Sequence, residues 1–191
     1  MQLQERTLDK LILENDDYIF AGDLTINGDV NIKNGSLIVS GTITFVRTTA
    51  TISITGGDIS CNELNSCSPI VIRDGDIYTK NLYANVIDSD GDIIVSEDVI
   101  VDTISCLNYM VSGNNNSCCI ITMQDVYISG ENDSYNIMAR DVLICGNNNS
   151  RNIKAHEVVI EGYCDTNGHG ITAKKFYCKG KIYNCSSMAI G

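Results

Sequence analysis

Apolar and polar residues alternate over short stretches of this chain, and the stretches return at a nearly fixed spacing. Three segments almost superimpose: they begin at Gly113, Gly130 and Gly146 and share the pattern I-x-[AM]-x-x-V-x-I-x-G. Alternation with a period of two is typical of a β-strand with one buried face. A helix would need apolar positions three and four residues apart, and the repeats lack that spacing.

The repeat can be extended along the sequence as three apolar ladders with steps of 16 to 18 residues. A repeat this short cannot bury its own apolar face, so it has to stack on its neighbours. The first ladder comprises Ile26, Ile43, Ile59, Ile77, Ile93, Tyr109, Val126, Val142, Val158 and Phe176. The second comprises Phe45, Cys61, Thr79, Val95, Val111, Ile128, Ile144, Ile160 and Cys178. The third comprises Ile70, Ile87, Ile104, Ile121, Ile137, Ile153 and Ile171.

These ladders predict an all-β fold, a single-stranded right-handed parallel β-helix of about nine to ten coils. We assign residues 21–191 to this β-solenoid and residues 1–20 to an N-terminal cap segment. In the cap, Leu8, Leu11 and Ile12 have helical spacing. The same stretch also contains KLIL, so a short capping helix and a first strand are both open.

The corners of the coils carry Asp, Asn and Gly, which favour turns. Leu64, Leu82 and Val99 form a further apolar row, which continues near Asn116 into the corners NNNS, ENDS and NNNS. The cross-section is therefore predicted to narrow from three apolar sides to two near residue 112. We expect the asparagines of these corners to stack as a ladder, with a polar binding strip for sugars or cations as the alternative. The ladder asparagines are Asn115, Asn132 and Asn148, and the serines Ser117, Ser134 and Ser150 should stack beside them.

The two ends of a solenoid expose unpaired backbone groups that invite strand addition. The segment KIYNCSSMAIG starts a further coil and shows no helix, Pro or charge cluster that would close it. We expect this end to pair with another copy, either as a two-fold dimer or as a filament, unless its last residues fold over the edge. The residues assigned to self-association are Ile182, Tyr183, Met188 and Ile190.

Composition narrows the function classes. The chain has 24 acidic and 13 basic side chains, a net charge of -11, which disfavours nucleic acids and anionic membranes as partners. No run of 18 apolar residues predicts a membrane span, and residues 1–6 do not resemble a secretory signal. Nine cysteines without a CxxC motif suggest reduced thiols. The expected location is the cytoplasm or a virus particle.

Metal and cofactor motifs are weak. The most plausible zinc set is Cys164, His169, Cys178 and Cys185, but its spacing is irregular, so we expect the cysteines to fill the core. The segment IDSDGD, with Asp88 and Asp90, lacks the full calcium-loop pattern. No nucleotide motif is present, and no cofactor is expected.

Catalytic motifs are equally sparse. His156 is predicted to face solvent and His169 to lie in a turn, without a Ser or Cys partner set by the repeat. Asp133 and Asp165 are candidate carboxylates of a carbohydrate-active β-helix, but the short coils leave no long loop to build a cleft. We therefore expect a protein that is not an enzyme.

The segment GDLTINGDVNIKNGSLIVSGTI, from Gly22 to Ile43, and the GDI triplets at residues 57, 75 and 91 resemble bactofilins and related polymer-forming β-solenoid proteins. The resemblance covers residues 20–180 and is one of texture. It implies a bacterial or virus-encoded scaffold that assembles end to end without nucleotide. The NNNS corners, the cysteine content and the absence of Pro-rich tails depart from that family.

Taken with the repeat, this resemblance favours a structural, self-assembling β-solenoid scaffold that associates through its terminal coils. A structural or recognition subunit of a larger particle, such as a virion or surface adhesin, is the first alternative. A carbohydrate-active β-helix enzyme is the second.

Overall fold

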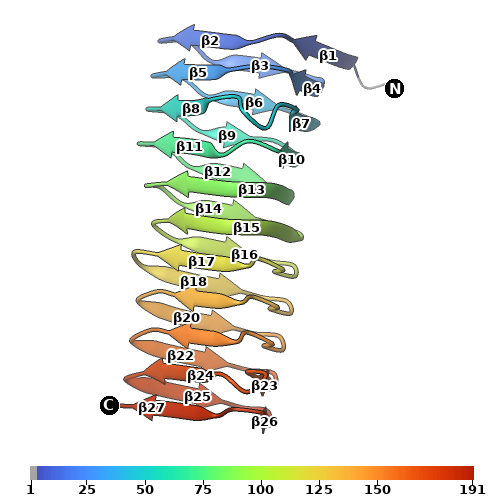
Figure 1. Cartoon of the computed structure of the whole chain (residues 1–191). Coiled ribbons are helices and arrows are strands. Elements are labelled where there is room, and N and C mark those ends of the chain that lie inside the picture. Colours follow the sequence, from blue (N-terminus) through green and yellow to red (C-terminus); the bar gives the residue numbers. More distant parts are fainter. Residues whose placement is uncertain (1–3) are drawn as a thin grey trace.

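The alternating stretches of the sequence form strands, and each strand pairs in parallel with a strand of the next coil. The computed structural model describes residues 4–191 and contains 27 strands and no helix in that range. The strands stack into a rod-shaped β-solenoid of about ten coils (Figure 1). The predicted fold class is confirmed.

One side of the rod is a ten-stranded sheet that takes one strand from each coil. Its strands are β3 (Tyr18–Phe20), β6 (Leu37–Val39), β9 (Ile59–Ser60), β12 (Ile77–Thr79), β14 (Ile93–Val95), β16 (Tyr109–Val111), β18 (Asp125–Ile128), β20 (Asp141–Ile144), β22 (Glu157–Ile160) and β25 (Lys175–Cys178).

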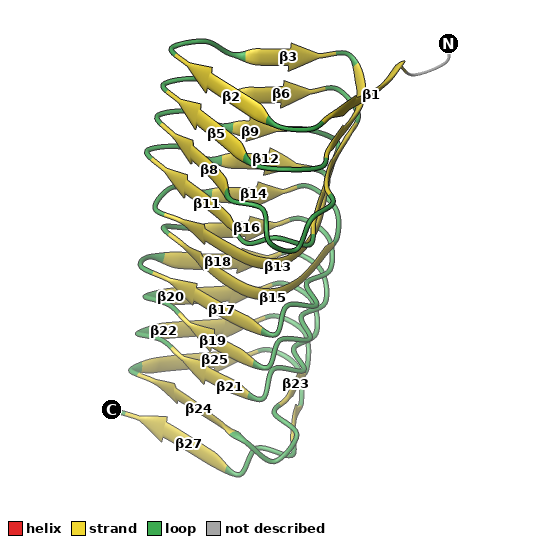
Figure 2. Cartoon of the chain, turned by 45° about the horizontal axis from the view of Figure 1, so that its top comes forward, coloured by secondary structure: helices red, strands yellow, loops and turns green. Residues whose placement is uncertain are grey.

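A fifteen-stranded sheet forms the other two sides. The strands of one side are β1 (Gln4–Leu8), β4 (Gly22–Ile26), β7 (Thr42–Phe45) and β10 (Glu63–Ser66). The strands of the other side are β2 (Leu11–Glu14), β5 (Val30–Lys33), β8 (Ile52–Thr55), β11 (Ile70–Arg73), β17 (Cys119–Thr122), β19 (Asn136–Met138), β21 (Asn152–Lys154), β24 (Gly170–Ala173) and β27 (Ser187–Ile190). The long strands β13 (Asn81–Ser89) and β15 (Val99–Cys106) bend around the corner and belong to both sides (Figure 2). A short pair, β23 (Cys164–Asp165) and β26 (Ile182–Tyr183), lies beyond them on the first of these sides.

The rod winds in the right-handed sense. In Figures 1 and 2, strands such as β2 and β5 run to the left in front, and β3 and β6 return to the right behind them, while the chain descends. This is the hand expected for parallel strands joined by crossovers.

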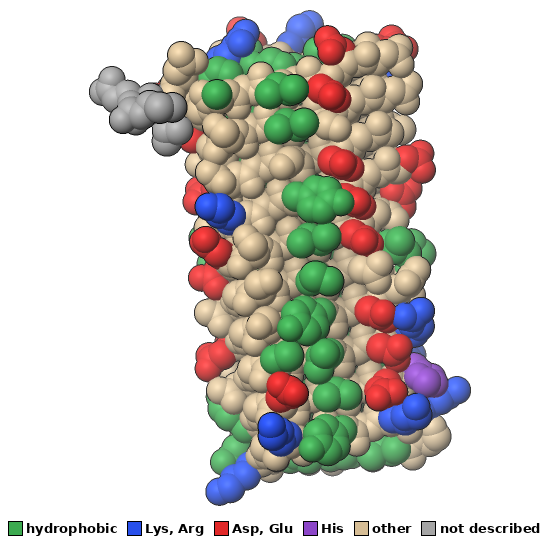
Figure 3. All heavy atoms as spheres, turned by 180° about the vertical axis from the view of Figure 1, so that it is seen from behind, with side chains coloured by type: hydrophobic (Ala, Val, Ile, Leu, Met, Phe, Trp, Pro, Cys, Tyr) green, Lys and Arg blue, Asp and Glu red, His purple; other side chains and the backbone are tan. Residues whose placement is uncertain are grey.

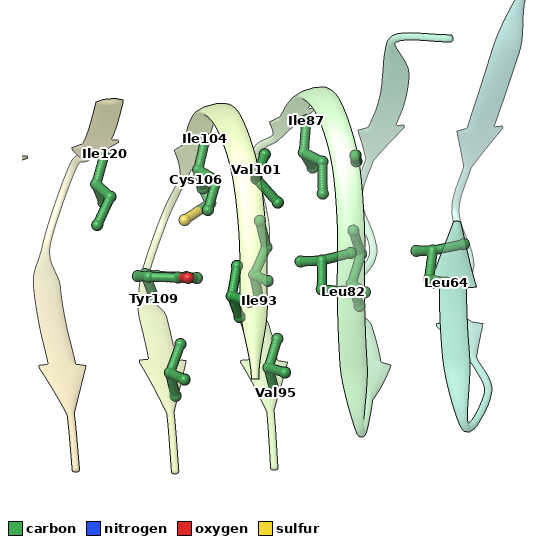
Figure 4. Packing of buried hydrophobic residues seen from close by; sticks show 14 of the residues in the cluster. Leu64, Leu82, Ile87, Ile93, Val95, Val101, Ile104, Cys106, Tyr109 and Ile120 are labelled. Carbon is green, nitrogen blue, oxygen red and sulfur yellow. The ribbon is translucent and has the colours of Figure 1, made fainter. Parts of the chain in front are cut away.

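Inward side chains from all three sides fill the interior as stacked columns. On the ten-stranded sheet, Val126, Val142 and Val158 are direct neighbours in register, and all three are buried. Figure 4 shows Leu64 and Leu82 in one such column, and Ile87, Ile104 and Ile120 in another. Apolar residues stacked in this way form one continuous core, which is the main stabilising term of the rod.

The start of the first ladder is wrong, because the first coils are longer than 16 to 18 residues. Ile59 pairs with Leu37, a step of 22 residues, and a loop at residues 46–51 takes up the excess. Ile26 therefore pairs with Phe45, and Ile43 with Leu64, on a different side of the rod. A fixed step carried the prediction from one side to another, and Phe45 is misplaced in the second ladder for the same reason.

The third ladder contains a one-residue error. Ile120, not Ile121, pairs with both Ile104 and Ile137 and is fully buried, whereas Ile121 is 42% exposed. The corner that leads to Val126 holds one residue more than the equivalent corner of the next coil. Because side chains alternate between faces, this shift moves Ile121 to the outside.

The capping-helix alternative is wrong. Residues 4–8 and 11–14 form β1 and β2, which pair in register with β4 and β5. Together with β3 they build a first coil of the same kind as the others, so the strand alternative is confirmed for the described residues; residues 1–3 of the cap segment lie outside them.

Candidate functional site

The last coil carries the inner columns to one end of the rod without covering them. Ile182 pairs with Cys164, Met188 with Ile171, and Ile190 with Ala173, so all three occupy inward positions. They are nevertheless 43%, 39% and 56% exposed, because no described residue packs over them. The structure thus brings three of the four residues assigned to self-association together at this end.

Tyr183 lies apart from that cluster. It alternates to the outside of the coil and packs edge-on against Tyr163, with ring centroids 5.9 Å apart. Its exposed surface belongs to the side of the rod, so Tyr183 contributes to the last coil without lining the end face.

At the opposite end, the first coil presents a second set of inward side chains. Leu13, Tyr18 and Phe20 are half-buried against the core. Arg6 occupies an inward position beside Leu24, with its guanidinium 5.6 Å from the Tyr18 ring, a cation–π distance. The sequence analysis did not list these residues as an interface, although the alternation in LIL and YIF was a signal for them.

The two ends display the same columns. The column that ends at Met188 begins at Leu11, and the column of the ten-stranded sheet that ends at Phe176 begins at Tyr18. Each end also has strands whose outer backbone groups have no partner among the described residues. An end of this kind can add a further coil by the pairing that holds the rod together.

The asparagine column lies inside the rod, where the apolar column through Leu82 and Val99 gives way to polar residues. Asn115, Asn132 and Asn148 follow Val99 in register and are at most 1% exposed. Nδ2 of each donates 2.7 Å hydrogen bonds along the rod, from Asn115 to Asn132 and from Asn132 to Asn148. The third side therefore persists near residue 112 as single-residue bridges with a polar interior, and it is not lost.

Neighbouring groups satisfy both ends of this column. Tyr109 donates its hydroxyl to Oδ1 of Asn115 over 2.6 Å, and Nδ2 of Asn148 reaches Sγ of Cys164 at 3.5 Å. Ser117, Ser134 and Ser150 donate to the asparagine in their own coil. Because the column is buried and internally bonded, it offers no open surface to a sugar or cation, and it acts as a structural feature of the core.

Buried thiols near the columns are poor nucleophiles. Burial raises the pKa of Cys106 to about 12 and the pKa values of Cys61 and Cys164 to about 11. A thiol with such a pKa stays protonated near pH 7, and the thiolate is the reactive form.

The remaining candidates do not form a catalytic or metal centre. Among residues 4–191, no group of three or more His, Cys, Asp and Glu side chains lies close enough to hold a metal ion. His156 lies on the surface with Nδ1 3.4 Å from a carboxylate oxygen of Asp141, and His169 is in a turn near Tyr135. Asp165 accepts hydrogen bonds from the Asn184 amide.

The other acidic candidates are also at corners. Asp88 pairs with Arg73, and Asp90 accepts the backbone N–H of Asp74 over 2.8 Å. Asp133 is exposed. These contacts close turns or link neighbouring coils, as short acidic side chains commonly do at turns.

Searches of protein-family models, curated proteins and solved structures find no match for this chain. The resemblance to bactofilins therefore remains a prediction. Within the part of the chain that the structure describes, no helix could span a membrane.

Proposed function

We propose that this protein is a structural scaffold that associates with itself end to end. The observation that carries the proposal is the cluster of Ile182, Met188 and Ile190, three apolar side chains in inward positions that nothing in the described chain covers. In every other coil, residues at these positions are packed beneath a neighbour.

Stacking the last coil of one copy on the first coil of another continues the columns across the junction. Met188 would lie over Leu11 of the next copy, Ile190 over Leu13, and Phe176 over Tyr18. Burial of apolar surface contributes about 25 cal/mol per Å². The same contact gives hydrogen-bond partners to the backbone groups at both ends.

Such a junction joins two different surfaces, so it is heterologous and leaves a free end on each side. Repeated addition gives a filament in which the β-sheets run through many copies. A cytoskeletal filament of the bactofilin kind is the form that the sequence resemblance favours, with the cytoplasm or a virus particle as its place of action. No nucleotide is needed, because the energy comes from the end surfaces.

The test compares the wild-type chain with Met188→Lys and Ile190→Lys by negative-stain electron microscopy and sedimentation velocity. A lysine at either position leaves a charge in a buried junction, so we expect filaments from the wild type and single rods from both variants. Ile100→Lys is the matched control, since Ile100 is 53% exposed on the side of the rod. A wild-type chain that stays monomeric at all concentrations, or end variants that still form filaments, would overturn the proposal.

A further inference from the structure

A continuous column of apolar side chains runs along the outside of the ten-stranded sheet. In nine of its ten strands, the outward residue at the middle of the strand is apolar, and these residues are direct neighbours in register. Figure 3 shows the column as a vertical line of green side chains. This outer apolar column comprises Ile19, Ile38, Tyr78, Ile94, Met110, Tyr127, Leu143, Val159 and Tyr177, with Ser60 as its one polar member.

Solvent contact alone does not explain this column. Ile19, Tyr177 and Met110 are 72%, 58% and 45% exposed. A sheet face in water normally alternates buried apolar with outward polar residues, and the outward positions of β5 and β8 follow that rule with Asn31 and Ser53. A line of exposed apolar side chains over the full length of a rod marks an interaction surface.

The flanks of the column differ in charge. On one side lies an acidic row that includes Asp76, Asp92 and Asp125, visible in red in Figure 3. On the other side the residues that follow each strand include Lys80 and Ser96, both exposed. A groove runs between the acidic row and the column, and Asp125, Tyr127, Asp141 and Leu143 are among the residues that line it.

We infer that a second copy of this chain docks on this face, side by side and pointing in the same direction, with a two-fold axis along the rod. In this arrangement each column lies in the groove of the other copy. The acidic row of one copy then faces the Lys80 and Ser96 side of the other. In the opposite arrangement, with the rods antiparallel, the two acidic rows would face each other, and like charges at close range disfavour that pairing.

The area is sufficient for a dimer of modest affinity. Ten strands spaced about 4.8 Å apart span roughly 43 Å, and the five residues from the acidic row to the opposite flank span about 13 Å. The two copies would bury about 1,100 Å² in total, which is at the lower end of the range for specific interfaces. The contact is therefore expected to depend on protein concentration.

The test uses the full chain with a photo-crosslinking phenylalanine derivative in place of Tyr78, followed by mass spectrometry of the linked peptides. A parallel pair links residue 78 to the strand at residues 77–79 of the second copy. An antiparallel pair would instead link it to residues 126–128, and that result, or the absence of any link between copies, would overturn the inference. Binding of a synthetic Lys-Leu peptide without linkage between copies would likewise overturn it, in favour of a basic partner.

Variants separate this contact from end-to-end assembly. Met110→Lys combined with Leu143→Lys changes two outward side chains, so circular dichroism should stay that of the wild type. We expect a loss of at least tenfold in the yield of the residue-78 crosslink, while Met188→Lys leaves that yield unchanged and Ile100→Lys serves as the control. A crosslink yield that survives the double variant would contradict the inference without affecting the end-to-end proposal.

Discussion

The side-chain amide of Asn115 donates a 2.7 Å hydrogen bond to Oδ1 of Asn132 in the next coil. Both side chains lie inside the rod, where an unpaired amide would cost about 1–3 kcal/mol. Since each amide depends on the next coil for its partner, the column works only when neighbouring coils stand in the observed register. It therefore fixes the register more strictly than aliphatic packing alone.

Asn132 has a partner on both sides, so its loss should have the largest effect on this column. Asn132→Ala removes the acceptor of Asn115 and the donor to Asn148, and we expect a destabilisation of about 2–4 kcal/mol. Urea unfolding followed by circular dichroism measures it. Asn116→Ala, at an exposed neighbour of Asn115, should change stability by less than about 0.5 kcal/mol. Equal effects in the two variants would show that the column is not a structural unit.

Adjacent isoleucines offer a matched test of the register in the seventh coil. Ile120 is fully buried between Ile104 and Ile137, so Ile120→Ala should cost about 2–5 kcal/mol. Ile121→Ala removes the same atoms from a side chain that is 42% exposed and should cost under about 1 kcal/mol. Thermal unfolding of the two variants decides between the registers. If Ile121→Ala proves the more harmful, the coil is out of register by one residue.

The glycine at residue 162 stands where two coils come close together. A Cβ there would collide with the backbone carbonyl oxygen of Gly146, while the N–H of Gly162 donates to that same oxygen over 3.1 Å. Gly162→Ala has to push the coils apart, and we expect a loss of about 1–3 kcal/mol in unfolding free energy. Ser112→Ala, at an exposed corner beside Gly113, provides the comparison and should be nearly neutral. A stable Gly162→Ala variant would show that the corner has room to spare.

Stability should fall at alkaline pH. Burial raises the pKa of Cys106 to about 12 and the pKa values of Cys61 and Cys164 to about 11, whereas a thiol in the unfolded chain ionises near pH 8.5. The folded state thus binds more protons than the unfolded state above that pH. The stabilisation is fully present below about pH 8 and is lost as the pH rises towards 11 and 12.

Urea unfolding at pH 7, 9 and 10 measures this dependence. Cys106→Ala should be less stable overall but should lose less stability between pH 7 and 10, because one thiol no longer contributes. A free energy of unfolding that is constant or rises over this range would contradict the assigned burial of the thiols.

Much of the architecture could be predicted because the interior repeats one position per strand. Val126, Val142 and Val158 are equally spaced in sequence and stack directly, and the same regularity marks Asn115, Asn132 and Asn148. A period of two identifies the strand, and a constant coil length places each strand on its neighbour.

The errors fall where the coil length changes. The loop at residues 46–51 lengthens one coil and moved Ile43 to the wrong side, and one extra residue exchanged Ile121 for Ile120. Corner loops tolerate such insertions at little cost, so the apolar pattern alone does not reveal them.

Surface features were harder to predict than the core. The outer apolar column had a signal in strand sequences such as IIV and VLI, where three apolar residues replace alternation, but the same letters also suit a buried strand. Only the three-dimensional arrangement shows which residue of each triplet faces outwards, and which end residues lie together.

Cryo-electron microscopy of the assembled wild-type protein tests the end-to-end proposal most directly. The account predicts filaments in which β27 of one copy lies about 4.8 Å from β2 of the next, with Met188 over Leu11 and no break in the stack of strands. Isolated rods of about ten coils with both ends in solvent, or filaments whose junctions leave Met188 and Ile190 exposed, would contradict it.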